Sequence, residues 1–180
     1  MRLTVFCLLF LPLFTSPALA QFEQPRLEAG VHFTTVDISG LGEKPVGGGG
    51  RLTLRMSRLV ALEGEVNRFP IGGATANFPM TQVLAGLRIG GRIGPFGIFG
   101  KVRPGYTRFD ASSYDHQFGR RANLDLGAVI SLYSSRHFGV RFDFGNTLIF
   151  FGNKPVQSPA GVSLGTRSNF QGGAGVFVHF

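Results

Sequence analysis

Apolar and polar residues alternate along most of the chain after its first 25 residues. Leu52 and Leu54, for example, lie on either side of Thr53. A period of two is typical of β-strands whose two faces meet different surroundings. The alternation predicts eight such strands, over residues 26–36, 50–57, 61–69, 81–91, 96–106, 122–133, 138–150 and 167–180.

The connections between these strands are alternately long and short. The long ones, 37–49, 70–80, 107–121 and 151–166, are rich in Gly, Pro, Asn and Ser, and the short ones are 58–60, 92–95 and 134–137. This order predicts an antiparallel up-and-down meander with the long loops at one end and the tight turns and both termini at the other. The glycine run 47–50 is interpreted as the flexible end of the first loop.

The last predicted strand reaches the end of the chain with an apolar set at alternate positions, Ala174, Val176, Val178 and Phe180. An unpaired strand of this kind would expose a sticky sheet edge. Pairing it with the first strand removes the edge, so the sequence predicts a closed barrel.

Glycines fall mostly on the polar face of the predicted strands. A narrow eight-stranded barrel needs small residues inside, whereas glycines would leave holes in the apolar core of a soluble barrel. The apolar face is therefore expected to point outward into lipid, and the predicted fold is all-β, an eight-stranded antiparallel up-and-down transmembrane β-barrel. Some apolar residues share the inward parity, which predicts a mixed lumen: Val36, Leu84, Phe99, Val129, Ile149 and Phe177.

The inward parity also carries nearly balanced charge. Its cations are Arg51, Arg55, Arg88, Lys101, Arg103 and Arg141, and its anions are Glu28, Glu63, Glu65, Asp125 and Asp143. Because an unpaired buried charge is costly, this balance predicts a lumen plugged by ion pairs. A three-residue turn at 58–60 would place Arg55 opposite Glu63. The same register would place Thr53 opposite Glu65.

The first residues resemble a secretory signal peptide. Arg2 precedes an apolar run, and Ala18-Leu19-Ala20 is a small-x-small cleavage pattern. We therefore expect a cleaved segment at 1–20 and one barrel domain at 21–180. Cys7 is the only cysteine, so the predicted mature chain has no thiol, and no later run approaches the ~18–20 apolar residues of a spanning helix. The sequence predicts no cofactor and no metal site.

Basic residues outside the lumen raise the formal net charge of the whole chain to +8. One arginine lies in each tight turn, and others lie near the loop end: Arg68, Arg108, Arg120, Arg121 and Arg167. Arginine suits bidentate contact with phosphate, so two interpretations of the loop-end arginines stay open: contact with the phosphates of lipopolysaccharide, and generic solubilising charge. Aromatic residues at both ends suggest two girdles, with Phe96, Phe138 and Phe180 at the turn end and Phe69, Tyr106, Phe109, Phe150, Phe151 and Phe170 at the loop end.

The strand pattern, the terminal Phe180 and the segment Phe96-Gly97-Ile98-Phe99-Gly100-Lys101-Val102-Arg103-Pro104-Gly105 resemble the small OmpA/OmpX-type outer-membrane β-barrels. The resemblance implies a place in the outer membrane of a Gram-negative cell envelope, with periplasmic termini and outward loops. It also implies that Ala174, Val176, Val178 and Phe180 are the signal read by the barrel-assembly machinery. Outer-membrane lipid and an extracellular partner at the four long loops are the other expected partners.

Two classes of function follow from this resemblance. The first is a structural or interaction barrel for envelope integrity, adhesion or lipopolysaccharide contact. The second is a lipid-modifying enzyme of the lipid A deacylase kind, or a narrow conduit. The enzyme interpretation is weak, because Arg167-Ser168-Asn169 lacks the expected histidine, and His32, His116, His137 and His179 are scattered. The basic charge is dispersed, so nucleic acid is not an expected partner.

Overall fold

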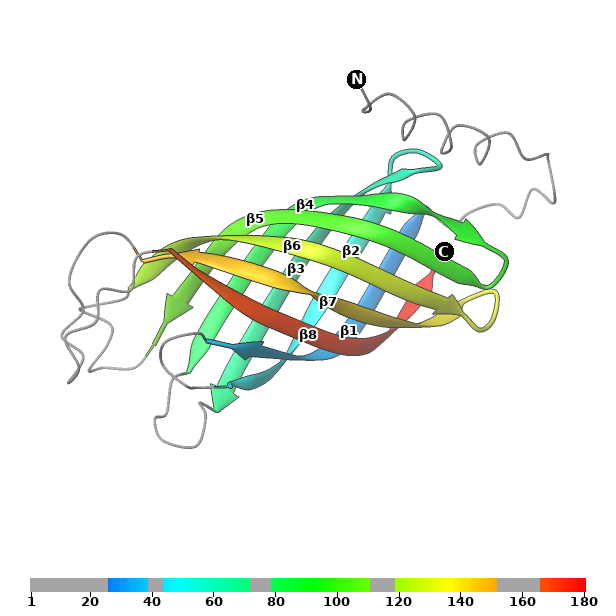
Figure 1. Ribbon diagram of the computed structural model, residues 1–180. Coiled ribbons are helices and arrows are strands. Elements are labelled where there is room, and N and C mark those ends of the chain that lie inside the picture. Colours follow the sequence, from blue (N-terminus) through cyan, green and yellow to red (C-terminus); the bar gives the residue numbers. More distant parts are fainter. Residues whose placement is uncertain (1–25, 39–43, 72–78, 111–118, 152–165) are drawn as a thin grey trace, which may run out of the picture.

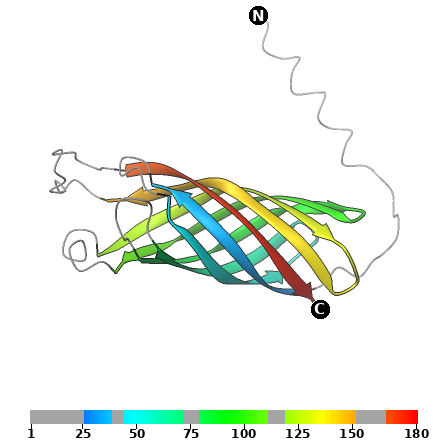
Figure 2. The same cartoon turned by 90° about the horizontal axis from the view of Figure 1, so that it is seen from below.

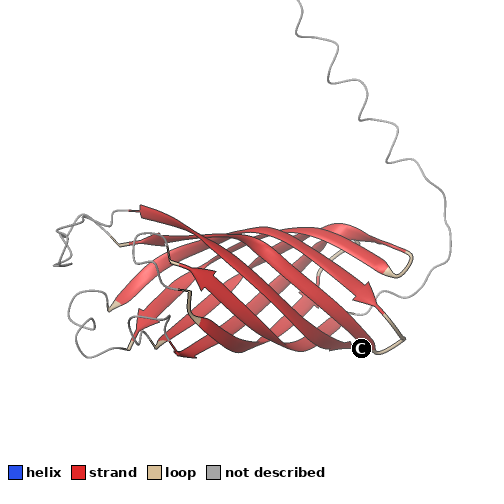
Figure 3. Cartoon of the chain, turned by 60° about the horizontal axis from the view of Figure 1, so that its bottom comes forward, coloured by secondary structure: helices blue, strands red, loops and turns tan. Residues whose placement is uncertain are grey.

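The computed structural model describes residues 26–38, 44–71, 79–110, 119–151 and 166–180. These residues form eight β-strands (Figure 3). None of the described residues lies in a helix that is long and apolar enough to cross a membrane. The strands are β1 (Leu27–Asp37), β2 (Val46–Arg55), β3 (Val60–Ile71), β4 (Met80–Ile93), β5 (Phe96–Phe109), β6 (Arg120–Tyr133), β7 (Phe138–Phe150) and β8 (Thr166–His179).

Each strand pairs antiparallel with its neighbour in sequence, and β8 pairs with β1 to close the barrel (Figure 2). At the seam, the backbone N–H of Phe180 donates to the carbonyl of Leu27, and that of Arg26 donates to the carbonyl of Phe180, both at 2.9 Å. The predicted fold class is therefore confirmed. Closure satisfies the edge of β8 without any covering element.

The two ends of the barrel differ, as Figure 1 shows. The tight turns β2–β3, β4–β5 and β6–β7 and the chain end at Phe180 lie at one end, which we call the turn end. The four connections that contain the undescribed residues 39–43, 72–78, 111–118 and 152–165 join the strands at the other, which we call the loop end. The predicted signal peptide at 1–20 lies outside the described residues.

Several strands reach further toward the loop end than predicted. The glycine run 47–50 belongs to β2, where Gly48 pairs with Arg68, so its interpretation as a flexible loop end is wrong. Glycine is required there by close approach, since a Cβ on Gly49 would lie 2.3 Å from the carbonyl oxygen of Val66. β5 likewise continues to Phe109 and β6 begins at Arg120, which shortens the loop predicted at 107–121.

The predicted register of the first hairpin is also wrong. Thr53 pairs with Glu63 and Arg51 with Glu65, two residues away from the expected register. The turn occupies 57–59, not 58–60, because the Ser57 hydroxyl accepts hydrogen bonds from the backbone N–H groups of Leu59 and Val60. Moving a three-residue turn by one position shifts the pairing of every later residue by two.

The two faces of the wall follow the predicted parity. Outward side chains such as Val31 and Phe33 are 64% and 77% exposed, whereas the charged inward residues are buried, except for the partly buried Arg55. The six apolar residues predicted to face the lumen are buried as well: Val36, Leu84, Phe99, Val129, Ile149 and Phe177. A Cβ on Gly145 would lie 2.7 Å from the Cα of Gly127. Inward glycines therefore let the wall close around bulky ionic side chains.

Candidate functional site

The lumen is filled in layers from the loop end to the turn end, and different strands contribute to different layers. Apolar side chains come first, then amides and hydroxyls, then charged groups, and then aromatic rings with a smaller ionic cluster. Along β3, for example, Phe69, Asn67, Glu65 and Glu63 follow one another on the inward face. The same period-two alternation thus supplies a different chemistry at each level.

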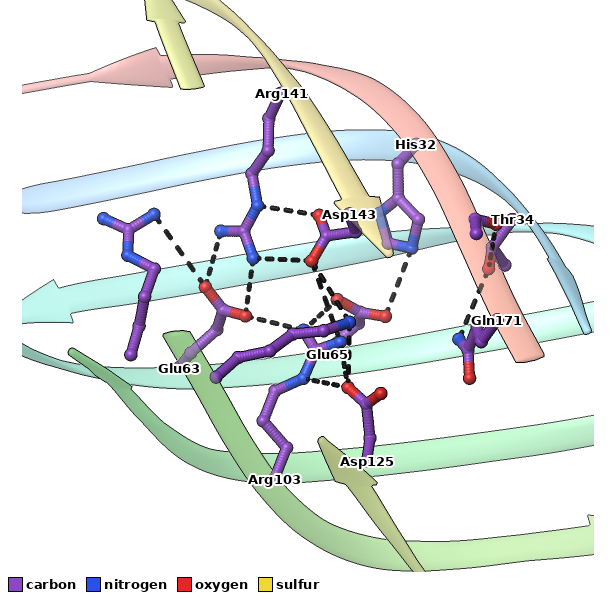
Figure 4. Close-up of polar contacts among 12 residues, drawn as sticks. His32, Thr34, Glu63, Glu65, Arg103, Asp125, Arg141, Asp143 and Gln171 are labelled. Carbon is purple, nitrogen blue, oxygen red and sulfur yellow. Dashed lines mark hydrogen bonds and ion pairs between the residues drawn. The ribbon is translucent and has the colours of Figure 1, made fainter. Parts of the chain in front are cut away.

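Two arginines form the centre of the charged layer (Figure 4). Arg103 donates to Glu63 and Glu65 at 2.6 Å and to Asp125 at 2.8 Å. Arg141 donates hydrogen bonds to both carboxylate oxygens of Glu63, at 2.5 and 2.8 Å, and also donates to Asp143. Each guanidinium is at most 3% exposed, so these bonds form where water cannot screen them.

Two further cations complete the charged layer. Arg51 lies 2.8 Å from Glu65 and 3.0 Å from Asp143. The Lys101 ammonium lies 3.0 Å from Asp125 and 3.4 Å from Asp143. The network therefore links β2, β3, β5, β6 and β7 across the barrel.

A second cluster lies nearer the turn end, around Glu28. Its carboxylate accepts a hydrogen bond from the Tyr133 hydroxyl at 2.9 Å and lies 2.9 Å from Arg88 and 3.7 Å from Arg55. Arg88 also stacks over the ring of Phe99, with 4.3 Å from its guanidinium carbon to the ring centroid. The structure thus brings all eleven predicted lumen charges into two connected clusters, and Tyr133 is a partner that the charge count did not reveal.

Neutral polar side chains cover the charged layer on its loop side. Asn67 donates through Nδ2 to Glu65 at 2.7 Å, and its Oδ1 accepts from the Nε2–H of His32 at 2.6 Å. Gln82 and Gln171 bond each other through their amides at 3.2 and 3.3 Å. Sequence reasoning missed this layer, because an amide on the polar face carries no charge signal. Its one visible trace is the inward parity of these residues.

An apolar cluster closes the loop end of the lumen. It consists of Val36, Ile38, Phe69, Met80, Phe109, Ile149 and Phe151. Phe69, Phe109 and Phe151 are at most 2% exposed, so their assignment to an outer aromatic girdle is wrong. All three share the inward parity of the adjoining strand. Phe109 and Phe151 lay beyond the predicted strand ends, whereas Phe69 was the last residue of its predicted strand and already had the inward parity. Tyr106, Phe150 and Phe170 do face outward, as do Phe96, Phe138 and Phe180 at the turn end.

A cavity of about 10 Å³ lies between Glu28, Arg51, Thr53, Arg141 and Phe177. That volume accommodates about one water molecule. The arrangement suits a rigid plug, since opening a path would require breaking several buried ion pairs together.

Outside the barrel, three of the predicted lipopolysaccharide contacts lie in one row at the loop end. Pairing runs from Arg68 to Thr81, from Thr81 to Arg108, and from Arg108 to Arg120, across β3 to β6. We call Arg68, Arg108 and Arg120 the arginine row. They surround a hollow of about 490 Å³ that is also lined by Thr81, Tyr106 and Asp110.

Asp110 holds two members of the arginine row in place. It forms ion pairs with Arg68 and with Arg108, the latter at 3.1 Å, and Arg68 also donates to the Thr81 hydroxyl at 2.6 Å. The Arg68 and Arg108 side chains remain about half exposed. The row therefore keeps a formal charge of +2 after Asp110 is counted. Asp110 lay in a predicted loop, so nothing in the alternation pointed to it.

The other two predicted contacts, Arg121 and Arg167, lie elsewhere. Arg121 pairs with the fully buried Thr107, and Arg167 with the buried Ile149, so both have the inward parity. Neighbouring residues of a strand point to opposite faces, which separates Arg121 from Arg120. The predicted assembly residues Ala174, Val176, Val178 and Phe180 lie on the outward side of β8 and at the chain end.

The candidate enzyme residues do not converge among the described residues. Ser168 is on the outward face near the loop end of β8, whereas His137 and His179 are at the turn end and His32 points into the lumen. His116 lies outside the described residues. Within the described ranges, no three His, Cys, Asp or Glu side chains are grouped so that they could hold a metal ion.

Comparison with known proteins identifies relatives of this barrel. The family described as "Outer membrane protein beta-barrel domain" matches residues 6–176. The chain is similar to the structure of Neisserial surface protein A, with 16% identity, a TM-score of 0.55, and coverage of 86% of this chain and 96% of that one. No curated protein matches.

Two more solved structures are similar. OprG from Pseudomonas aeruginosa has 13% identity and a TM-score of 0.52, with coverage of 87% of this chain and 96% of that one. Ail of Yersinia pestis, solved in complex with the heparin analogue sucrose octasulfate, has 15% identity and a TM-score of 0.50, with coverage of 86% and 96%. At these identities the likeness is one of fold.

Proposed function

Because this chain belongs to the outer membrane protein beta-barrel domain family, we propose that it is a structural barrel that holds lipopolysaccharide phosphate at its loop end. The observation that carries the proposal is the arginine row, three outward guanidiniums around one hollow. The likenesses above concern the fold, so the function rests on the site itself.

Charge and geometry both favour a phosphate ligand. A phosphate monoester carries about −1.5 to −2 at neutral pH, which matches the formal +2 of the arginine row. Guanidinium groups bind phosphate oxygens bidentately, and Asp110 orients two of the three. Arg120 has no ion pair among the described residues and lines the same hollow, so it is available to a ligand.

The orientation in the membrane is part of the proposal. In bacterial outer-membrane barrels, short turns face the periplasm and longer connections face outward. The arginine row would then lie at the outer leaflet, level with lipopolysaccharide phosphates, and both termini would be periplasmic. Loop-mediated adhesion is a prediction, because the central parts of the four loops lie outside the described residues. Recognition by the barrel-assembly machinery is a prediction that rests on the alternate apolar residues of β8 and the terminal Phe180.

The filled lumen favours a structural role over transport. Five strands contribute charged groups that bond one another across the barrel, and the cavity beside them holds about one water molecule. A conduit would need a continuous wet path. The scattered histidines and outward Ser168 likewise give no support to a lipid-modifying enzyme.

The test is neutralisation of the arginine row in the triple variant Arg68→Gln, Arg108→Gln, Arg120→Gln. We expect its affinity for lipopolysaccharide to fall at least about tenfold, since each charge-assisted bond contributes about 1.5–3 kcal/mol. The matched control is Arg58→Gln with Arg136→Gln, two exposed arginines of the turn end. Unchanged binding by the triple variant, with its barrel still intact by heat-modifiable gel migration, would refute the proposal.

A further inference from the structure

An apolar groove of about 880 Å³ crosses the outer wall of the barrel beside the arginine row. Its floor is made of small outward residues, Gly50, Gly64 and Ala85, and its sides include Val31, Leu52 and Val66. A Cβ added to Gly64 would meet no atom within 4 Å. The barrel's own packing therefore does not require glycine at this position.

The groove continues directly from the arginine row along the same strands. Val66 lies two residues from Arg68 on β3, and Val83 lies two residues from Thr81 on β4. Two residues of a strand span about 7 Å. Val66, Val83 and Tyr106 are consecutive register partners, and Tyr106 also lines the phosphate hollow. A charged head site and an apolar channel thus adjoin on one face.

We propose that the groove holds an acyl chain of the same lipid A molecule whose phosphate lies on the arginine row. This inference rests on the proposed function and adds a second contact to that site. Head and tail would be bound together, so the barrel would select an acylated phosphate and not merely a phosphate. Arg68 and Arg108 would fix the head, and the glycine floor would let the chain lie against the wall.

Charge complementarity favours lipid A over a glycerophospholipid. A phosphodiester head carries one negative charge, whereas a monoester phosphate of lipid A carries about −1.5 to −2, which matches the +2 of the arginine row in magnitude. A second copy of this chain fits the groove less well. A two-fold axis along the membrane normal would bring two arginine rows to the same level, where like charges repel.

Gly64→Leu is the test variant, because it fills the groove without a clash inside the barrel. Gly100→Leu is its matched control: Gly100 is exposed, an added Cβ would have its nearest contact at 3.8 Å, and the residue does not line the groove. Ala85→Phe fills the same groove from β4 as a second variant. Binding is measured in detergent with lipid A, with its fully deacylated bisphosphorylated disaccharide, and with phosphatidylglycerol.

We expect Gly64→Leu and Ala85→Phe to weaken lipid A binding by about fivefold. The effect is modest because an acyl chain in an apolar medium gains van der Waals contacts in the groove but no hydrophobic free energy. The deacylated disaccharide should bind the wild type, Gly64→Leu, Ala85→Phe and Gly100→Leu equally. The arginine triple variant should bind neither lipid A nor the deacylated disaccharide. The phosphate site and the groove are therefore tested by different variants. If lipid A binding is unchanged in both groove variants, the proposed acyl-chain site is refuted, whereas the proposed phosphate site is not.

Two other outcomes would also overturn the inference. If phosphatidylglycerol binds as tightly as lipid A and Gly64→Leu weakens both equally, the occupant is a generic phospholipid chain. If the wild type is a dimer in detergent and Gly64→Leu makes it a monomer, the occupant is a second copy.

Discussion

Glu63 is the carboxylate on which the charged layer depends most directly. It is 1% exposed, and it accepts hydrogen bonds from both Arg103 and Arg141. The substitution Glu63→Gln keeps the volume of the side chain and removes its charge. The two charged clusters would then hold six cations and four anions, where those of the wild type hold six and five.

The expected cost follows from the burial of the partners. Removing one member of a buried ion pair typically costs about 3–5 kcal/mol, because the remaining charge stays buried without compensation. That range lowers the folding equilibrium constant by roughly two to nearly four orders of magnitude. With a urea dependence of about 2 kcal/mol per molar, the unfolding midpoint should fall by about 2 M.

The chain has no tryptophan, so the folded fraction is best followed by heat-modifiable gel migration after equilibration in urea. Asp37→Asn is the control, because Asp37 and Lys44 form an exposed pair that is worth about 0–1 kcal/mol. The double variant Glu63→Gln, Arg141→Gln should be less destabilised than the sum of its single variants. A midpoint for Glu63→Gln equal to that of Asp37→Asn would refute the role of the network.

Three further predictions concern the wall, the loop end and the outer surface. Gly145→Leu should give no heat-modifiable folded band, because its Cβ would lie 2.2 Å from the carbonyl oxygen of Leu126, whereas Gly64→Leu should fold normally. Phe109→Ala should lower the unfolding free energy by about 3–5 kcal/mol in the same urea assay, and the outward Phe33→Ala by clearly less; equal losses would contradict the inward placement of Phe109. Raising the salt from 0.1 to 1 M should weaken lipopolysaccharide binding to the exposed arginine row but leave the urea midpoint nearly unchanged, since buried pairs are little screened.

The contents of the two faces could be read from the sequence because side-chain direction in a strand depends only on position along that strand. Period two assigned Glu63 and Arg103 to one face and Leu62 and Val102 to the other, without any knowledge of neighbours. The same reasoning found the inward apolar residues and the need for closure at β8. Wherever a strand end was misjudged, as before Phe109, the rule could not be applied and a buried ring was assigned to the surface.

Cross-strand neighbours were decided only by the tertiary structure. The Ser57 hydroxyl sets the first turn, and one position there places Thr53 instead of Arg55 opposite Glu63. The arginine row joins residues 68, 108 and 120, which become neighbours only through three successive registers.

The sequence by itself therefore determined the fold class and which side of the wall each strand residue faces, because alternation is local. Register, ion partners and the groove beside the arginine row depend on turns and barrel closure, which act between distant segments. Those interactions, and not the alternation, create the sites at which this barrel can bind a ligand.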